Sequence, residues 1–408
     1  MKIKGNVLVG QSGGPTAVIN SSLAGVFEAA RDAGAEKIYG MRYGIEGFLN
    51  ENIVDLCTVL KTSLDTELLK RTPSSYLGSC RFKLPEPLNG SAVYEKLFSL
   101  FSKYNICAFF YIGGNDSMDT VKKLSEYAAQ INSPVRFIGV PKTIDNDLCV
   151  TDHTPGYGSA AKFIATAVKE LVCDSLVYDL ESVTIVEIMG RDAGWLTGAA
   201  ALSKGEDCEG PALIFLPEVP FDYEYVKTRI KEIQKTRKSF VIALSEGIRT
   251  KDGRYVCELG KESSKDAFGH TQLSNAGQTV AAMLKKDLGI KTRAVELSTL
   301  QRCASHIVSL TDLNEAYAVG NAAVRAAAGG HTGEMVFIKR ISTNPYVSET
   351  DTYDIRAVAN MEKPVPRNMI NESGDFVTEE FIGFVRPLTE GSAENITVNG
   401  LSAHIKPL

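Results

Sequence analysis

A short apolar strand, then a glycine-rich or polar loop, then a helical stretch recurs along the chain, and this repeat constrains the fold most. The apolar runs are continuous, which is typical of strands buried on both faces of a parallel sheet. The repeat therefore predicts an α/β fold with mainly parallel sheets, whose ligands gather beyond the carboxyl ends of the strands. The loops at those ends are GQSGGPT after 7–9, GGNDS after 108–112, PKTIDND after 137–140, MGRDAG after 184–188, PE after 212–216 and SEG after 240–244.

A chain of 408 residues is too long for one hydrophobic core of ordinary size. We therefore expect two doubly wound, Rossmann-like domains. Beyond residue 341 the pattern changes to scattered prolines, short apolar runs and charges. Residues 342–408 are expected to form a carboxyl-terminal extension packed on the body.

Charge and cysteine usage exclude several classes of partner. The net charge of −5 argues against nucleic acid or an anionic membrane as the main partner. No segment approaches the ~20 apolar residues of a membrane span, and the apolar run at the amino terminus is too short for a signal-peptide core. The 8 cysteines include no CxxC pair, which disfavours a zinc knuckle or a redox dithiol. We expect a cytoplasmic protein with reduced thiols.

Two glycine pairs follow strands and precede helices. Gly13-Gly14 precedes a helix predicted over 17–32, and glycines at a helix start let backbone N–H groups approach an anion. Gly113-Gly114 precedes a second helix, for which Ser117 is the expected capping residue. Each pair could bind phosphate, or be an ordinary tight turn.

The most specific string is PKTIDND at 141–147. Asp145 and Asp147 flank an amide, and Lys142 is the only cation of the loop. Phosphoryl transfer to a hydroxyl needs a carboxylate base, groups that hold Mg²⁺ and a cation for the transferred group. The alternative is a solvated acidic turn.

Arginines supply candidate phosphate ligands. Arg191 follows a strand directly, where its planar fork could bind a sugar phosphate, and Arg81, Arg293 and Arg302 are further cations. Glu246, also at a strand end, could accept hydrogen bonds from sugar hydroxyls. For each residue the alternative is an ordinary surface position.

Taken together, these strings resemble the phosphofructokinase family over about residues 5–340. The motifs that carry the resemblance are SGGPTAVIN, LGSCRF, GGNDS, PKTIDND, MGR, SEG and TRAVELSTLQR. The resemblance implies a phosphoryl-donor domain over 1–156 plus 301–341, a sugar-phosphate domain over 157–300, and a site in the cleft between them.

The resemblance also implies roles for single residues. Asp145 would be the base that takes the proton from the 1-hydroxyl of fructose 6-phosphate, and Arg81 would face the transferred phosphoryl group. Arg293 would reach the sugar phosphate of a neighbouring subunit, so a homodimer or homotetramer is expected. The implied substrate-binding residues are Thr143, Ile144, Asp145, Met189, Gly190, Arg191, Glu246, Arg293, Thr299 and Arg302.

The donor side resembles the pyrophosphate-dependent branch of the family. ATP-using relatives carry glycine where this chain has Asp116 and Lys142. A carboxylate there adds like charge beside the α-phosphate of a nucleotide, which is unfavourable away from bulk water. Lys142 would serve as a cation for pyrophosphate. The implied pyrophosphate-binding residues are Gly13, Gly114, Asp116 and Lys142, and the implied Mg²⁺ ligands are Asn115 and Asp147.

The expected activity is reversible, Mg²⁺-dependent transfer from pyrophosphate to fructose 6-phosphate in glycolysis or gluconeogenesis. One alternative is an ATP-dependent 6-phosphofructokinase. Another is a sedoheptulose 7-phosphate kinase, because Thr299 and Ser182 replace a histidine and an arginine of bacterial ATP-using relatives. A third is a non-catalytic regulatory subunit, against which Asp145, Asp147 and Arg191 argue.

Overall fold

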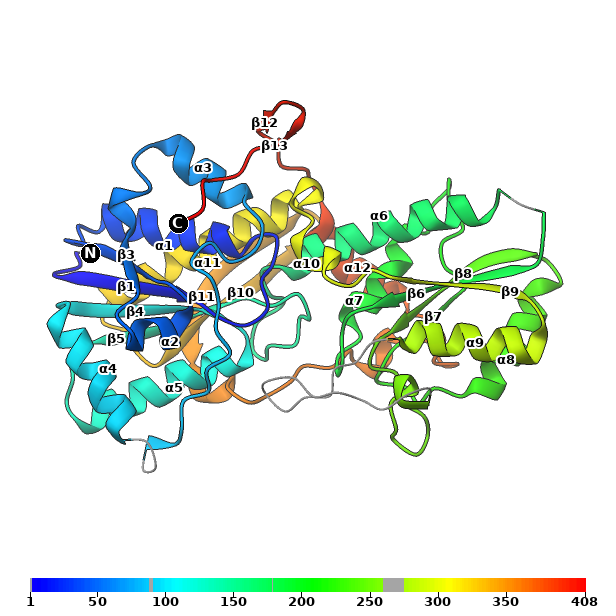
Figure 1. Ribbon diagram of the computed structural model, residues 1–408, viewed down its shortest axis with the longest axis horizontal. Helices are drawn as coiled ribbons and strands as arrows, with labels where there is room; N and C mark the ends of the chain where they lie inside the picture. The colour runs from blue at the N-terminus through cyan, green and yellow to red at the C-terminus, as the bar shows by residue number, and fades with distance from the viewer. Residues whose placement is uncertain (1, 88–90, 178, 260–274) are drawn as a thin grey trace. The chain divides into compact units, whose positions relative to one another are not determined.

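The chain folds into two compact units (Figure 1). The computed structural model describes residues 2–87, 91–177, 179–259 and 275–408. The first unit comprises Met1–Ser159, Arg302–Glu362 and Glu390–Leu408, and the second Ala160–Gln301 and Lys363–Thr389.

A seven-stranded sheet forms the centre of the first unit, in the order β11-β10-β5-β4-β1-β2-β3. From β10 to β2 neighbouring strands are parallel, whereas β3 and β11 are antiparallel edge strands. The mainly parallel α/β architecture expected from the sequence is confirmed. The strands are β1 Asn6–Gln11, β2 Ile38–Met41, β3 Ile53–Asp55, β4 Ile106–Gly113, β5 Arg136–Pro141, β10 Glu334–Thr343 and β11 Tyr346–Asp354.

Helices cover both faces of this sheet, which explains why a central strand such as β4 is continuously apolar. Along β4, Phe110 and Ile112 join the core cluster that contains α1 and α11 residues, while Phe109 and Tyr111 join the cluster of α4 and α5. Successive side chains of a strand point to opposite faces, so one apolar run serves two cores. The described elements are α1 Ile19–Asp32, α2 Gly44–Leu49, η1 Leu56–Thr58, α3 Ser63–Arg71, α4 Ser91–Lys103, α5 Asn115–Gln130, η5 Ser305–Ile307, α11 Leu310–Ala328, η6 Ile355–Ala357 and the small hairpin of β12 Thr397–Val398 and β13 Leu401–Ser402.

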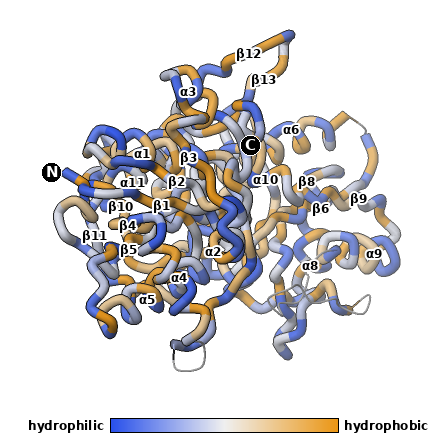
Figure 2. Tube along the Cα trace, turned by 60° about the vertical axis from the view of Figure 1, so that its left-hand side comes forward, coloured by the Kyte–Doolittle hydropathy of each residue, from blue (hydrophilic) through white to orange (hydrophobic). Residues whose placement is uncertain are grey.

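The second unit contains a four-stranded parallel sheet in the order β7-β8-β6-β9. Figure 2 shows β8, at the middle of this sheet, mostly in hydrophobic colours. The strands are β6 Ser182–Ile188, β7 Leu213–Phe215, β8 Ser239–Ser245 and β9 Lys291–Glu296. The helices are α6 Tyr157–Ser175 and α10 Leu300–Cys303, each of which begins or ends in the first unit, and α7 Trp195–Gly198, η3 Ala199–Ser203, α8 Tyr223–Gln234, η4 Val256–Leu259, α9 Ala276–Leu288, η7 Arg367–Met369, α12 Glu379–Val385 and η8 Arg386–Thr389.

Residues 342–408 are divided between the two units, whereas the sequence predicted one extension. β11 pairs with β10 as a hairpin and thereby completes the large sheet. The segment 363–389 belongs to the second unit, where Trp195 Nε1 donates to Lys363 O at 2.8 Å and Ile214 N donates to Asp375 O at 2.8 Å. The chain passes between the units at 159/160, 301/302, 362/363 and 389/390; of these, the first two were expected at 156/157 and 300/301.

Two local predictions differ from the structure. Ser117 does not cap α5, because the helix begins at Asn115 after Gly114, which places Ser117 inside the first turn. The first helix begins at Ile19, two residues later than predicted, after Val18 in a non-helical conformation.

In the described ranges no helix has the length and apolarity to cross a membrane. All 8 cysteines are free thiols.

Helices α1 and α11 pack with their backbones in close contact through two glycines. A Cβ on Gly320 would lie 2.1 Å from Ser22 O, and one on Gly25 would lie 2.2 Å from Tyr317 O. Because both obstacles are backbone atoms, a side chain at either position would force the helices apart.

We expect Gly320→Ala to lower the free energy of unfolding by about 1–3 kcal/mol, because the overlap outweighs the higher helix propensity of alanine. Thermal and denaturant unfolding would measure the change. The matched control is Gly383→Ala in α12, where a Cβ meets nothing within 4 Å. Equal stability of the two variants would contradict the close packing of α1 on α11.

Candidate active site

Three loops meet at one edge of the large sheet, because β1, β4 and β5 are neighbouring parallel strands. Hydrogen bonds fasten the loops to each other: Ser12 N donates to Ile112 O at 3.0 Å, and Lys142 N donates to Gly113 O at 3.0 Å. The glycine loop after β1, the GGNDS loop after β4 and the PKTIDND loop after β5 thus form one surface.

Lys142 lies across the glycine loop. Its Nζ donates to Gly14 O at 2.6 Å and would lie 3.4 Å from a Cβ on Gly13. A Cβ on Gly14 would lie 3.2 Å from an Nη of Arg302, so a second cation reaches the same loop. The family resemblance implied that Arg302 binds the substrate, and the structure places its guanidinium beside the glycine loop.

Burial and neighbouring carboxylates shift the pKa of Lys142 in opposite directions. Burial lowers the pKa of its ammonium to about 8; Asp145 and Asp147 raise this pKa, and Arg302 lowers it. Lys142 is only 2% exposed. Lys142 and Arg302 are two cations at the glycine loop that could bind an anion, and the carboxylates of Asp145 and Asp147 offset their charge.

The loop that carries Asp145 is closed on itself. Thr143 bridges to Gly156, and Thr154 donates through its N–H to Asn146 Oδ1 at 3.1 Å and through its hydroxyl to Thr143 O at 2.9 Å. Asp145 N donates to Thr143 Oγ1 at 3.1 Å. We call residues 143–156 the catalytic loop, after the role that the family resemblance implies for Asp145; its ends and its turn are held by its own hydrogen bonds.

Two buried residues fix the turn of the catalytic loop. Asn146 is fully buried with a left-handed φ of 56°, which asparagine tolerates better than most residues. Ile144 is 6% exposed and anchors the preceding position. Asp145 and Asp147 are each only partly buried on either side of Asn146.

The segment that carries Arg81 is attached to the glycine loop. Ser79 Oγ donates to Gly13 O at 2.7 Å, and Ser12 Oγ donates to Cys80 O at 3.4 Å. Arg81 follows directly and is exposed. The structure thus keeps the backbone of an arginine segment beside the glycine loop.

Helix α5 brings Asn115 and Asp116 to the same edge. Gly114 is its N-cap, without a side-chain cap from the described residues, so the helix start is suited to an anion. Asp116 lies in the first turn with its side chain 46% exposed, and Lys83 approaches its carboxylate at 3.9 Å.

The oxygen atoms present suit Mg²⁺. Asn115 Oδ1 is buried without a hydrogen-bond partner among the described residues, and Asp147 supplies a carboxylate. The described ranges contain no group of three or more His, Cys, Asp or Glu side chains arranged for a metal. Mg²⁺ commonly takes only one or two protein oxygens and completes its shell with water and phosphate, so these residues fit it.

In the second unit, the loops after β6 and β8 are bonded together. Gly190 N donates to Glu246 Oε1 at 3.4 Å, and Ser245 Oγ donates to Gly190 O at 2.5 Å. Gly190 has a φ of 123°, and a Cβ on Gly247 would lie 1.9 Å from Arg191 O. The close backbone approach fixes the segment that carries Arg191 against the loop of Glu246.

The other predicted sugar-site residues of this unit are Met189, Arg293 and Thr299. Met189 N donates to the buried Gln301 Oε1 at 3.2 Å. Arg293 lies on the edge strand β9 with its side chain 58% exposed, 3.4 Å from Asp174. Thr299 is exposed.

Several residues that hold the site are not among those predicted from the sequence. Ser79 lies inside the LGSCR motif, and a hydroxyl next to a glycine is a recognisable signal. Gln301 lies inside the TRAVELSTLQR motif, whereas Lys83 gives no local signal, since its partner Asp116 is distant in sequence. Thr154 and Gly156 lie beyond the string that drew attention, although they close the catalytic loop.

An α/β fold whose adjacent strand ends present glycine loops, a buried cation and a two-carboxylate loop defines a phosphate-handling protein. The family model for phosphofructokinase matches residues 6–327. The chain belongs to the phosphofructokinase family.

The chain is similar to known proteins over nearly its whole length. It is 40% identical to the pyrophosphate–fructose 6-phosphate 1-phosphotransferase of Halomonas elongata over 97% of this chain and 94% of that protein. It is 39% identical to the protein of the same name from Methylococcus capsulatus, over 98% and 95%. The crystal structure of the pyrophosphate-dependent phosphofructokinase of Nitrosospira multiformis matches with a TM-score of 0.89 and 37% identity, over 99% of this chain and 97% of that one.

The lowered pKa of Lys142 gives a test of its burial. Between pH 8 and 10.5 the unfolded chain binds this proton and the folded chain does not, so stability rises with pH across that window. Lys142→Met should remove roughly 3 kcal/mol of this rise. Denaturant unfolding at a series of pH values would measure it, with the exposed Lys61→Met as control. Parallel pH curves for wild type and Lys142→Met would contradict a depressed pKa.

Proposed function

We propose that this protein transfers a phosphoryl group reversibly from pyrophosphate to the 1-hydroxyl of fructose 6-phosphate, giving fructose 1,6-bisphosphate and phosphate. The observation that carries the proposal is the buried ammonium of Lys142, bonded across the glycine loop at Gly14 O. The names of the relatives at 39–40% identity support it.

The donor follows from charge and space. Lys142 provides a cation beside Gly13, where a compact, highly charged donor gains most. Asp116 adds a carboxylate at the start of α5, next to the same loops. A nucleotide would have to bring its α-phosphate past this carboxylate, whereas pyrophosphate has no α-phosphate to place.

The chain's own residues have separate parts in the reaction. Asp145 accepts the proton of the 1-hydroxyl, with its backbone held by Thr143. Arg81 faces the transferred phosphoryl group and stabilises its charge. Arg302, whose guanidinium reaches the glycine loop, adds a further cation.

The sugar phosphate binds through the paired loops of the second unit. Arg191 binds phosphate and Glu246 accepts hydrogen bonds from sugar hydroxyls, while Met189 and Gly190 shape the backbone between them. Thr299 is a further proposed substrate contact of this unit. Thr143 and Ile144 of the catalytic loop are proposed separately as substrate contacts of the first unit.

Asn115 and Asp147 hold Mg²⁺. When bound, the ion neutralises charge on the pyrophosphate oxygens. Asn115 Oδ1 is buried and has no hydrogen-bond partner among the described residues, which supports this assignment.

The proposal includes a homodimer or homotetramer that works in the cytoplasm, in glycolysis or gluconeogenesis. Arg293 supports the oligomer, because it is exposed on an edge strand, where a neighbouring subunit's substrate could reach it. Eight free thiols are typical of a reducing compartment.

The direct test follows bisphosphate formation by purified protein with Mg²⁺ and fructose 6-phosphate, with pyrophosphate and ATP in parallel. We expect turnover with pyrophosphate and little with ATP. Turnover with ATP alone would overturn the account of the donor, and none with either would overturn the proposed function. Sedoheptulose 7-phosphate as the alternative acceptor tests the choice of sugar.

The double variant Asp116→Gly/Lys142→Gly tests which residues select the donor. Removing the carboxylate and the ammonium should raise the ratio of kcat/KM for ATP to that for pyrophosphate by about tenfold or more. The exposed pair Asp32→Gly/Lys61→Gly is the control. An unchanged ratio in folded protein would mean that other residues select the donor.

Asp145→Asn removes the proposed base with little change in volume. We expect kcat to fall by about 10²–10⁴-fold, the usual contribution of a general base, with the KM values changed much less. Steady-state kinetics measure both, and Asp32→Asn at an exposed position is the control. Retention of most of the activity would exclude Asp145 as the base.

A further inference from the structure

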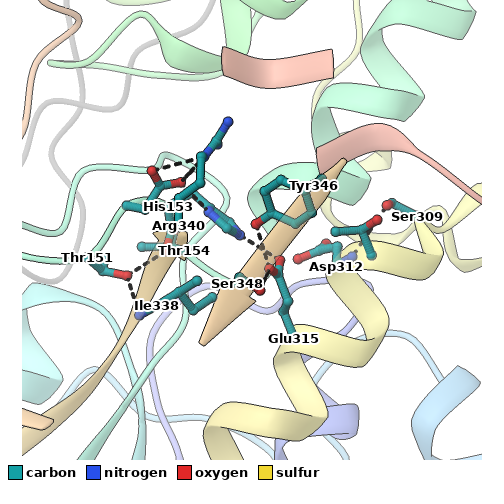
Figure 3. A network of polar contacts seen from close by, with 12 residues as sticks. Thr151, His153, Thr154, Ser309, Asp312, Glu315, Ile338, Arg340, Tyr346 and Ser348 are labelled. Carbon is teal, nitrogen blue, oxygen red and sulfur yellow. Dashed lines mark hydrogen bonds and ion pairs between the residues drawn. The ribbon is translucent and has the colours of Figure 1, made fainter. Parts of the chain in front are cut away.

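A buried polar network attaches the catalytic loop to α11 and to the β10–β11 hairpin (Figure 3). At its centre is His153, which is 1% exposed. Its Nδ1 lies 2.8 Å from Asp152 Oδ1, and its Nε2 lies 2.6 Å from Glu315 Oε2 on α11. Both ring nitrogens thus face carboxylates.

The imidazole is charged at neutral pH. Burial alone would lower its pKa, but Glu315 and Asp152 outweigh burial and raise the pKa of His153 to about 9. As an imidazolium it donates through both nitrogens at once, which the neutral ring cannot do.

Each carboxylate is also held from the hairpin. Glu315 Oε1 accepts hydrogen bonds from Tyr346 Oη and Ser348 Oγ, both at 2.6 Å, and Figure 3 shows both side chains pointing toward it. Asp152 accepts a fork from Arg340, through Nε at 3.2 Å and Nη2 at 2.9 Å. The network therefore joins three elements rather than one pair.

Backbone contacts attach the same loop segment to β10. Asp152 N donates to Ile338 O at 2.9 Å, and Ile338 N donates to Thr151 Oγ1 at 3.0 Å. Thr151 Oγ1 in turn donates to His153 O at 2.7 Å. The position of the His153 backbone is thus set by β10.

A second attachment to α11 follows the histidine. The buried carboxylate of Asp312 accepts from Gly156 N at 2.8 Å and from Ser159 N at 2.9 Å. Gly156 is the residue that bridges to Thr143. The segment 152–156 is therefore fixed at both of its ends.

This fixed segment is bonded directly to the residues around the proposed base. Thr154, next to His153, holds Asn146 Oδ1 and Thr143 O, and Thr143 Oγ1 accepts from Asp145 N. A displacement of His153 would therefore reach Asp145 through two short hydrogen-bonded steps. A misplacement of about 1 Å can lower a rate about 10²-fold.

We infer that His153, clamped between Asp152 and Glu315, is a positioning residue for phosphoryl transfer, which fixes the catalytic loop bearing Asp145 and Asp147. The inference rests on the proposed function for its catalytic consequence. It also gives a role to the β10–β11 hairpin, which lies beyond residues 6–327 matched by the family model and supplies Arg340, Tyr346 and Ser348.

The test compares His153→Gln with His331→Gln. His331 pairs with Glu334 but is 50% exposed, so the same substitution there is a matched control. Glutamine keeps one donor but cannot carry the charge. Steady-state kinetics with pyrophosphate and fructose 6-phosphate give kcat and KM, and hydrogen exchange by mass spectrometry gives the protection of the loop.

For His153→Gln we expect kcat to fall about 10–100-fold, with KM for pyrophosphate changed less than about threefold, because Lys142 and the glycine loop remain. The rate of amide hydrogen exchange should increase in peptides that cover residues 143–156 and should remain unchanged in those that cover α5. His331→Gln should match wild type in all three measurements.

Two results would overturn the inference: kcat within about twofold of wild type, or exchange that quickens uniformly across the first unit, which is the mark of a purely structural role. If His153→Gln does not fold, Tyr346→Phe/Ser348→Ala removes only the hydroxyls on Glu315 and should give the same pattern in weaker form. If the wild-type protein shows no activity with pyrophosphate, the proposed function fails. The hydrogen-exchange rates of the 143–156 peptides then still show whether His153 fixes the catalytic loop.

Discussion

The hydrogen-bonded parallel order of β5, β4 and β1 is the constraint on which the donor side depends. It brings three loops from distant parts of the sequence to one edge, and the bonds from Ser12 N to Ile112 O and from Lys142 N to Gly113 O hold their register. Each loop alone is an ordinary turn. Their combination places glycines, a buried ammonium and a two-carboxylate loop within reach of one another, which no single motif could achieve.

Much of this arrangement could be predicted from the sequence. Continuous apolar runs such as 108–112 indicated strands buried on both faces, and the two core clusters that share β4 show why. The ordered motifs indicated the family. The antiparallel β11 could not be predicted in the same way, because its sequence YVSETDTYD is mostly polar and has no continuous apolar run; it forms a strand by pairing with β10.

The contacts that fix the site were harder to predict, because they join residues far apart in the sequence. Arg302 reaches the glycine loop after β1, and Glu315 reaches His153 across 162 positions. A sequence pattern reports which chemistry a loop carries, but not which distant carboxylate or carbonyl holds it. The start of α5 shows that a local pattern can also mislead. Ser117 is a residue type that favours N-caps, yet the helix begins at Asn115 and Ser117 lies inside its first turn.

The bond from Lys142 Nζ to Gly14 O has a consequence for how this family diversifies. The ammonium that we assign to donor recognition is also the hydrogen-bond partner of the loop it lies on. A descendant that loses the lysine leaves the Gly14 carbonyl without this hydrogen-bond donor, so the substitution that changes the phosphoryl donor also removes a bond that holds the glycine loop. Changes of phosphoryl donor within the family should therefore be rare and should occur through linked substitutions.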